Sequence, residues 1–258
     1  MRPAVGVVEL DGLSLTTATW GDGSPELVML HDGLGSITQW GTLPERLHRE
    51  LSMTVLAYDR AGHGASRPRA GGAWPSDWMH TEARRLGSLL DASAAGAPLL
   101  VGHSDGASIA LLHAADRPRD VAAVVALAPH SHVEVVCVAA ISGMRRHRAP
   151  LVAALARHHE DPSGLFDAWS GAWVSAGFAS WDIRARLGEI IVPVLVVQGD
   201  ADEYATPAML TDTAAAIGPA CDARLLPGLG HLLHREAPDT IVELVASFVS
   251  GSARPMRS

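Results

Sequence analysis

Short, uninterrupted apolar segments recur along the chain, and most are followed by residues with helical periodicity. The segments lie at 26–31, 53–58, 97–102, 121–128 and 192–198. A strand that is apolar on both faces must be covered on both faces, which is typical of a parallel sheet between two layers of helices. The sequence therefore predicts an α/β fold. Helices are expected at 40–51, 77–90, 107–115, 206–217 and 238–249, with a further short strand at 223–226.

The first residues depart from this alternation. Two β-prone runs, Val5 to Leu10 and Leu13 to Trp20, are separated by Asp11-Gly12. Asp-Gly between two such runs is a strong signal for a two-residue hairpin turn. We therefore expect the sheet to begin with an antiparallel hairpin.

The length and the interruption of the pattern indicate how the chain is organised. Its 258 residues suit one well-buried core better than two full domains. Between 131 and 190 the alternation stops, and tryptophans, histidines and arginines occur there without a clear strand. We predict a core domain formed by 1–130 and 191–258, with 131–190 inserted as a helical cap.

A G-x-S-x-G motif joins a predicted strand to a predicted helix. The segment Gly102-His103-Ser104-Asp105-Gly106 ends the apolar run 97–102 and precedes the helix expected from Ala107. A sharp turn here lifts the serine hydroxyl above the sheet, and glycines keep side chains out of the tight backbone. The same string occurs in ordinary loops, but its place between strand and helix favours Ser104 as a nucleophile.

A serine nucleophile needs a base and an orienting carboxylate, which in this architecture follow it in the order carboxylate, then histidine. The strand at 192–198 runs into a loop where the G-x-x-D spacing favours Asp202. His231 lies in the loop before the last helix, where the base belongs. The competing candidates are Asp200, Glu203, the reserve carboxylate Glu134, and His234.

The loop after the segment 26–31 is the expected oxyanion hole. One backbone N–H from Gly33 or Leu34 would bind the oxyanion together with the N–H of Asp105. The residues alone do not decide between Gly33 and Leu34. The imidazole of His31 is expected to tie this loop together rather than to take part in the chemistry.

Other functional classes are disfavoured. The net charge of −8 opposes binding to nucleic acid. The two cysteines form no CxxC pair and there is no H-E-x-x-H, so we expect no metal site. No apolar run is long enough for a spanning helix, and the first residues do not resemble a signal peptide. We expect a cytoplasmic monomer or homodimer that acts on a small molecule without membrane contact.

The chain resembles the α/β-hydrolase superfamily. Four landmarks occur in the usual order: His31-Asp32-Gly33-Leu34-Gly35, Asp59-Arg60-Ala61-Gly62-His63-Gly64, the serine motif, and Asp202 with Gly230-His231. The chain is similar to the capped branch that contains proline iminopeptidases, meta-cleavage C–C hydrolases and valacyclovir-hydrolase-like esterases. This resemblance implies an eight-stranded, mostly parallel sheet, a helical lid after the sixth strand and no cofactor. Asp32 departs from the pattern, because glycine is usual there.

Asp32, Trp169 and Trp173 are candidates for substrate binding, and either Asp105 or Asp32 could recognise an amine. In valacyclovir-hydrolase-like enzymes the aspartate after the nucleophile helps to recognise a substrate ammonium group, so the resemblance implies this role for Asp105. Alternatively, Asp105 and Asp32 are tied to backbone N–H groups or to Arg60. In the cap, Trp169 and Trp173 share one helix face, which either packs as core or lines the pocket.

These features favour a serine hydrolase that cleaves a carboxylic ester, thioester or lactone of a small-to-medium substrate through an acyl-enzyme. Two alternatives remain. A C–C bond hydrolase acting on a diketone-like substrate uses the same triad. A ligand-binding protein with this fold would show little turnover, because fold does not determine function.

Overall fold

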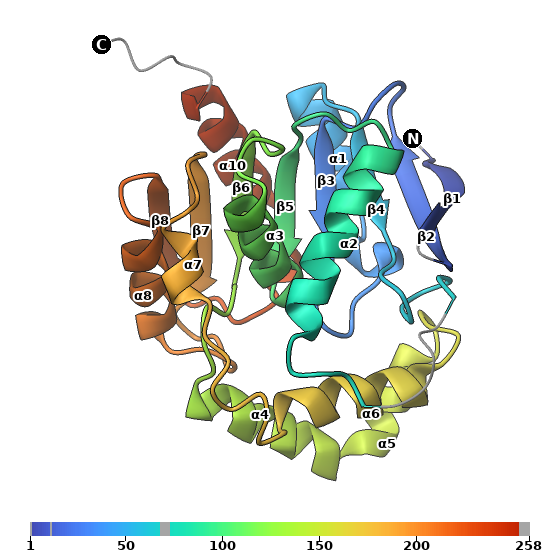
Figure 1. Cartoon of the computed structure of the whole chain (residues 1–258), viewed down its shortest axis with the longest axis vertical. Helices are drawn as coiled ribbons and strands as arrows, with labels where there is room; N and C mark the ends of the chain where they lie inside the picture. The colour runs from blue at the N-terminus through green and yellow to red at the C-terminus, as the bar shows by residue number, and fades with distance from the viewer. Residues whose placement is uncertain (1, 11, 68–72, 253–258) are drawn as a thin grey trace.

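The computed structural model describes residues 2–10, 12–67 and 73–252, which form a single eight-stranded sheet with helices on both faces (Figure 1). The strands are β1 Ala4–Leu10, β2 Leu13–Trp20, β3 Leu27–Leu30, β4 Val55–Tyr58, β5 Leu99–His103, β6 Ala123–Leu127, β7 Val194–Gly199 and β8 Cys221–Leu226. The helices are α1 Leu43–Leu51, α2 Trp78–Ala92, α3 Asp105–Asp116, α4 Val135–Arg146, α5 Arg148–Leu155, α6 Pro162–Trp173, α7 Arg184–Leu187, α8 Pro207–Ile217, α9 Leu233–Glu236 and α10 Pro238–Ser252, with a 3₁₀ turn at Ile37–Trp40.

The strand order is β1-β2-β4-β3-β5-β6-β7-β8. The pairs β1–β2 and β2–β4 are antiparallel, and all other neighbours are parallel. The predicted hairpin is confirmed by the register that pairs Leu10 with Leu13, although its turn residue Asp11 lies outside the described residues. The eight-stranded, mostly parallel sheet is therefore as the family resemblance implies.

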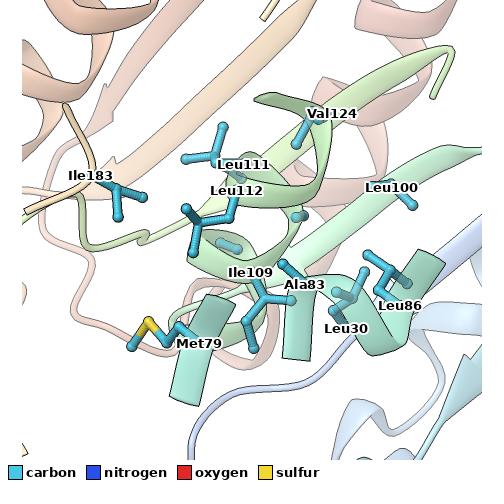
Figure 2. Close-up of a cluster of buried hydrophobic side chains, with 14 of the residues drawn as sticks. Leu30, Met79, Ala83, Leu86, Leu100, Ile109, Leu111, Leu112, Val124 and Ile183 are labelled. Atoms are coloured by element: carbon cyan, nitrogen blue, oxygen red, sulfur yellow. The ribbon is translucent and has the colours of Figure 1, made fainter. Parts of the chain in front are cut away.

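Two apolar cores, one on each face, hold the helices to the sheet. Side chains alternate along a strand, so Leu30 faces one core and Met29 the other. The first core contains residues of α2, α3, α7 and α8, and the second those of α1 and α10. Figure 2 shows part of the first core, where Leu30 and Leu100 of the sheet meet Leu86 of α2. This two-sided burial is the reason why the strands are apolar throughout.

One predicted helix differs from the structure. The expected helix over 40–51 is a 3₁₀ turn at Ile37–Trp40 followed by α1 from Leu43. Gly41 separates the two elements with φ of 60°, a conformation that continues neither helix. The helical periodicity of this region is real, but a glycine in the left-handed region divides it.

Three helices of the segment 131–190 lie as a layer across one end of the sheet (Figure 1). They are α4, α5 and α6, and an isolated bridge between His132 and Asp182 joins the two chain segments that lead into and out of the layer. The fourth helix, α7, packs instead on α3 and α8 beside the sheet. The division into a core and a cap with boundaries at 131 and 190 stays a prediction.

The layer covers the end of the sheet at which the parallel strands finish. Loops that follow parallel strands meet at one edge, which is where α/β proteins bind their ligands. The segments after β3, β5, β6, β7 and β8 all emerge there. No helix in the described part of the chain combines the length and the apolar character needed to cross a membrane.

Candidate active site

The turn between β5 and α3 holds Ser104 in a strained conformation. Its φ is 52° and its ψ is −122°, a backbone conformation that residues other than glycine rarely adopt. A Cβ on Gly102 would lie 2.5 Å from the Cα of Ala107, and a Cβ on Gly106 would lie 2.2 Å from the carbonyl oxygen of Leu30. Both flanking glycines are therefore required by backbone contacts, as the motif predicts.

The structure brings the three predicted catalytic residues together. The Oγ of Ser104 lies 2.9 Å from Nε2 of His231. Nδ1 of His231 lies 2.9 and 3.0 Å from the two carboxylate oxygens of Asp202. Because a carboxylate accepts hydrogen bonds, Nδ1 carries the proton and the lone pair of Nε2 faces the serine hydroxyl. The side chains thus form one hydrogen-bonded chain from β7 and β8 to the nucleophile.

The surroundings of these hydrogen-bonded side chains shift the pKa values of His231 and Asp202. Burial opposes the charged form of His231, but the hydrogen bond and charge of Asp202 outweigh it, and the pKa of His231 lies above its usual value. Burial also opposes ionisation of Asp202, yet its hydrogen bond to His231 leaves the pKa of Asp202 lowered. Asp202 therefore stays ionised beside His231 over a wider pH range than a free aspartate would.

This geometry predicts an acidic limb in the pH profile of hydrolysis. Protonated His231 cannot accept the proton of Ser104, so kcat/KM falls as the pH drops through the pKa of His231. The midpoint is expected above the unperturbed value of about 6.5, with a plateau at higher pH. The measurement is kcat/KM for an uncharged ester between about pH 5 and 9. A midpoint below the unperturbed value would contradict the assigned role of Asp202.

The competing carboxylates accept hydrogen bonds from loop residues and not from the imidazole of His231. Asp200 accepts the N–H of Gly228 at 2.7 Å. Glu134 accepts both the N–H and the hydroxyl of Thr206, at 2.8 and 2.6 Å. Glu203 accepts the backbone N–H of the base at 3.3 Å, not its imidazole. The rival base His234 lies against Trp40, with ring centroids 4.9 Å apart, and has no contact with the nucleophile among the hydrogen bonds of the described residues.

The structure distinguishes the two N–H groups that the sequence offers as oxyanion donors in the loop after β3. The N–H of Leu34 donates to Oδ1 of Asp32 at 3.0 Å. Among the described residues no hydrogen bond uses the N–H of Gly33 or that of Asp105. Of the two loop donors considered from the sequence, Gly33 is therefore the one that remains available.

Buried side chains contact the four carbonyl oxygens of residues 31–34. Arg60 donates to the first two carbonyl oxygens of 31–34, at 2.5 and 2.7 Å. A ring nitrogen of His63 lies 3.1 Å from the third, and one of His159 lies 3.0 Å from the fourth. Because each peptide plane is held by its carbonyl, the direction of the N–H groups is set before any ligand binds. His159 reaches the loop from the segment between α5 and α6.

His31 ties the same loop, as the sequence predicts. Its Nε2 accepts the backbone N–H of Arg60 at 3.1 Å, so Nδ1 carries the proton and donates to the carbonyl oxygen of Asp32 at 2.8 Å. Sequence reasoning assigned no role to His63 or His159. His63 belongs to a motif that was recognised, whereas His159 is 125 residues from its partner Leu34 and carries no local signal.

Asp32 faces a second buried histidine. His103 donates from Nε2 to the carbonyl oxygen of His231 at 2.9 Å, and its Nδ1 lies 3.4 Å from Oδ2 of Asp32. Burial opposes ionisation of Asp32, but the contact with His103 outweighs it and holds the pKa of Asp32 well below its usual range. Asp32 is thus hydrogen-bonded to Leu34 and lies beside His103, whose Nδ1 has no hydrogen-bond partner among the described residues. The bond to Leu34 agrees with the alternative of a carboxylate held within the protein.

Asp105 has different partners. Its Oδ2 accepts hydrogen bonds from the indole N–H groups of Trp169 at 2.8 Å and Trp173 at 3.5 Å. Burial raises the pKa of Asp105 to about 6, although Arg60 and the two indoles work in the opposite direction. Both tryptophans pack in the first apolar core and also line the cavity above Ser104, so the two roles considered for them coexist.

A cavity of about 150 Å³ opens above Ser104. Its polar wall includes three carboxylates, from Asp32, Asp105 and Glu203, and no lysine or arginine is among the residues that line it. From the helical layer, five residues line the cavity: Cys137, Ile141, Met144, Trp169 and Trp173. In the described part of the chain, no group of three or more histidine, cysteine, aspartate or glutamate side chains is arranged to hold a metal ion.

The chain has relatives among characterised hydrolases. It is 25% identical over 271 residues to 2-(acetamidomethylene)succinate hydrolase of Mesorhizobium japonicum, covering 94% of each chain. It is 26% identical over 257 residues to human serine hydrolase BPHL, covering 94% of this chain and 85% of the relative. The match to Lipase LipV of Mycobacterium tuberculosis, 33% identical over 119 residues, spans 45% of this chain and 42% of the relative, so less than half of LipV is matched.

Solved structures and a family model agree with these relatives. The structure of Est816, described as an N-acyl homoserine lactone degrading enzyme, has a TM-score of 0.74 and 25% identity, and covers 94% of this chain and 100% of Est816. A family model described as the alpha/beta hydrolase family matches residues 27–244. This match spans Ser104, Asp202 and His231. The chain therefore belongs to the alpha/beta hydrolase family.

Proposed function

We propose that the protein is a serine hydrolase that cleaves an ester, thioester or lactone of a small-to-medium substrate through an acyl-enzyme. The observation that carries this proposal is the hydrogen-bonded chain Ser104–His231–Asp202 at the floor of a cavity. The relatives described as a lipase, a serine hydrolase and a lactone-degrading enzyme support the same class of bond. We keep as expectations a small-molecule substrate, a monomer or homodimer, a cytoplasmic location and no nucleic-acid partner.

The proposed reaction begins with attack of the Ser104 hydroxyl on the substrate carbonyl. His231 takes the hydroxyl proton as the new C–O bond forms, and Asp202 stabilises the resulting imidazolium. The oxyanion accepts hydrogen bonds from the N–H groups of Gly33 and Asp105. His231 then protonates the leaving group, and water, activated by the same imidazole, releases the acid and restores the serine.

The side-chain contacts to the carbonyl groups of residues 31–34 explain how the N–H of Gly33 can bind the oxyanion without reorganisation of the loop. Donors that are already oriented need no reorganisation as charge develops, and removing one such donor typically costs about 10²–10³ in rate. The carboxylate of Asp32 would oppose a nearby oxyanion. Its hydrogen bond from Leu34 and the nearby positive charge of the buried Arg60 guanidinium, which donates to the backbone carbonyl of Asp32, reduce that opposition.

The first experiment follows the initial turnovers of a short-chain p-nitrophenyl ester. Slow deacylation would give a burst of p-nitrophenol equal to the enzyme concentration, followed by steady turnover. Steady turnover without a burst still agrees with hydrolysis when acylation is the slow step. An enzyme that cleaves vinylogous diketones but no ester would instead be a C–C hydrolase. Binding without turnover of either substrate would indicate a ligand-binding protein.

Within this function, Asp105 is proposed to bind an amine-bearing substrate. The observed partners of its carboxylate are indole N–H groups that leave its charge uncompensated by a hydrogen-bonded cation. The lining also lacks lysine and arginine, which disfavours a dicarboxylate such as the substrate named for the succinate hydrolase relative. The buried carboxylate of Asp105 has lost its hydration. A substrate ammonium group beside it would replace that hydration with a hydrogen bond between two charged groups.

The prediction compares the benzyl esters of alanine and propanoic acid, which differ in one amino group. Wild-type protein is expected to prefer the amino ester by roughly 10- to 100-fold in kcat/KM, the range for a hydrogen bond to a charged group. Asp105→Asn keeps an acceptor for the indoles but removes the charge, so this preference should disappear. Equal turnover of the two esters by the wild type would refute amine recognition and leave the serine mechanism untouched.

A further inference from the structure

A second histidine lines the cavity and takes no part in the hydrogen-bonded chain of the triad. His130 follows β6 and is 2% exposed. Its ring centroid lies 6.0 Å from that of His231 and 5.1 Å from that of Trp173. Its ring nitrogens form no hydrogen bond among the described residues, and Nδ1 is enclosed without any partner.

An unpaired buried polar group requires an explanation, because nearly all such groups in folded proteins are hydrogen-bonded. Other described residues also have enclosed side-chain atoms without a partner, among them Trp78 and His113. Within the described part of the chain, His130 is the one residue that has such an atom and also lines the cavity. A ligand in the cavity can reach this imidazole through Nε2, which has no hydrogen bond among the described residues and is not enclosed, whereas the other residues do not line the cavity.

The backbone of His130 is held firmly against the nucleophile helix. Its N–H donates to Oγ of Ser108 at 3.0 Å, and the hydroxyl of Ser108 donates back to the carbonyl oxygen of His130 at 2.7 Å. Ser108 lies one turn after Ser104 on α3. The imidazole is therefore placed at a defined position relative to the attacking oxygen, as a substrate-binding group requires.

The order of the strands fixes the side from which His130 approaches the substrate. β5, which carries Ser104, lies between β3 and β6. The oxyanion donor Gly33 follows β3 and His130 follows β6, so the two lie on opposite sides of the nucleophile. A substrate whose carbonyl oxygen points to Gly33 directs another part of its structure toward His130.

We propose that His130 is a substrate-binding residue whose imidazole hydrogen-bonds an uncharged polar group, such as a hydroxyl or an amide, a few bonds from the scissile carbonyl. The proposal rests on the proposed serine hydrolysis and adds a substrate class to it. Because Nδ1 has no partner, neither tautomer is imposed, and Nε2 can donate to an oxygen or accept from a hydroxyl.

The electrostatic surroundings favour an uncharged partner for this histidine. Burial, followed by the neighbouring charge of His231, lowers the pKa of His130 to about 3, so the ring is neutral at the pH of catalysis. A neutral ring gives no ion pair to an anionic group, and the carboxylates of the cavity repel one. His130 also cannot act as a general acid in that state, which leaves hydrogen bonding as its role.

The test uses two matched substrate pairs. The first pair is p-nitrophenyl butanoate and its β-hydroxy analogue, which differ in the acyl half. The second pair is ethyl acetate and its hydroxyethyl analogue, which differ in the leaving group. The readout is the ratio of kcat/KM within each pair, so that a general loss of activity cancels. The proteins compared are the wild type, His130→Phe, His130→Asn and His113→Phe.

In at least one pair the wild type should favour the hydroxyl-bearing member about two- to tenfold, the range for one neutral hydrogen bond. His130→Phe should bring this ratio to about one, mainly through KM, and His130→Asn should restore part of it. His113→Phe removes an equally buried histidine with an unpaired Nε2 outside the cavity, and should keep the wild-type ratio. No preference in the wild type, or a preference that survives His130→Phe, would overturn the proposal.

Failure of the proposed function would remain distinguishable from failure of this inference. Ser104→Ala binds substrates without cleaving them, so the dissociation constants of the same pairs report the hydroxyl preference in the absence of turnover. If wild-type protein hydrolyses no ester, the serine hydrolase proposal is wrong. The binding ratios of Ser104→Ala, with and without His130→Phe, would still decide whether His130 contacts the hydroxyl.

Discussion

Ser104→Ala is expected to lower kcat/KM for a short-chain p-nitrophenyl ester by a factor on the order of 10⁴ to 10⁶ and to abolish any burst. The substitution removes the oxygen that lies 2.9 Å from Nε2 of His231, so no acyl-enzyme can form. The residual rate would come from substrate binding and from the oxyanion donors, which remain in place. The measurement is the pre-steady-state and steady-state release of p-nitrophenol.

The matched control for this variant is Ser93→Ala. The hydroxyl of Ser93 donates to the carbonyl oxygens of Leu89 and Leu90 at the end of α2, so its loss should leave kcat/KM within about twofold of wild type. The free energy of unfolding of both variants should stay within about 1 kcal/mol of the wild-type value. Full turnover by Ser104→Ala would place the chemistry elsewhere in the protein.

Gly106→Ala is expected to destabilise the fold by about 3 kcal/mol or more, and thereby to remove activity indirectly. A Cβ at Gly106 would lie 2.2 Å from the carbonyl oxygen of Leu30 and 2.4 Å from that of His31. Both are backbone atoms of β3 and the loop after it, which the paired sheet prevents from moving apart. Relief of the contact would require α3 to shift away from the sheet, with loss of packing on β3 and β5.

A helical glycine elsewhere in the chain provides the comparison. A Cβ on Gly143 in α4 would meet nothing closer than a guanidinium nitrogen of Arg146, 3.7 Å away. Gly143→Ala should therefore raise stability slightly, by up to about 1 kcal/mol, because alanine is the better helix former. The measurement is urea unfolding followed by far-UV circular dichroism and tryptophan fluorescence. Equal urea midpoints for Gly106→Ala and wild type would contradict the prediction. They would show that α3 can move away from β3 without loss of stability.

The strands and the nucleophile were predictable because their signals are local. The apolar run 97–102 predicts a strand that is observed at Leu99–His103, and the motif residues 102–106 begin within its last two residues. The turn requires glycine at positions 102 and 106. Both lie within five consecutive residues, so the requirement can be recognised in the sequence. The boundary of α1 was not predicted, because the conformation of Gly41 depends on the turn it makes rather than on its neighbours in the chain.

The positions of the carboxylate and the base were predictable through the topology. Once the strands are placed, parallel pairing brings the loops after β5, β7 and β8 to one edge of the sheet. Asp202 and His231 then lie in loops that agree with the chain order carboxylate, then histidine, and the structure adds the distances. The competing carboxylates Asp200, Glu203 and Glu134 were separated from Asp202 only by their observed partners, which are backbone groups and Thr206.

By itself, the sequence determined the α/β alternation, the strand-turn-helix around Ser104 and the order of the triad, because each depends on short-range spacing. Only the tertiary structure decided which N–H of the oxyanion loop is available, that His159 holds this loop from 125 residues away, and that His130 lies unpaired in the cavity. These outcomes depend on which side chains from distant segments meet. The contacts are set by how the helical layer packs over the sheet, a property that no periodicity in the chain encodes.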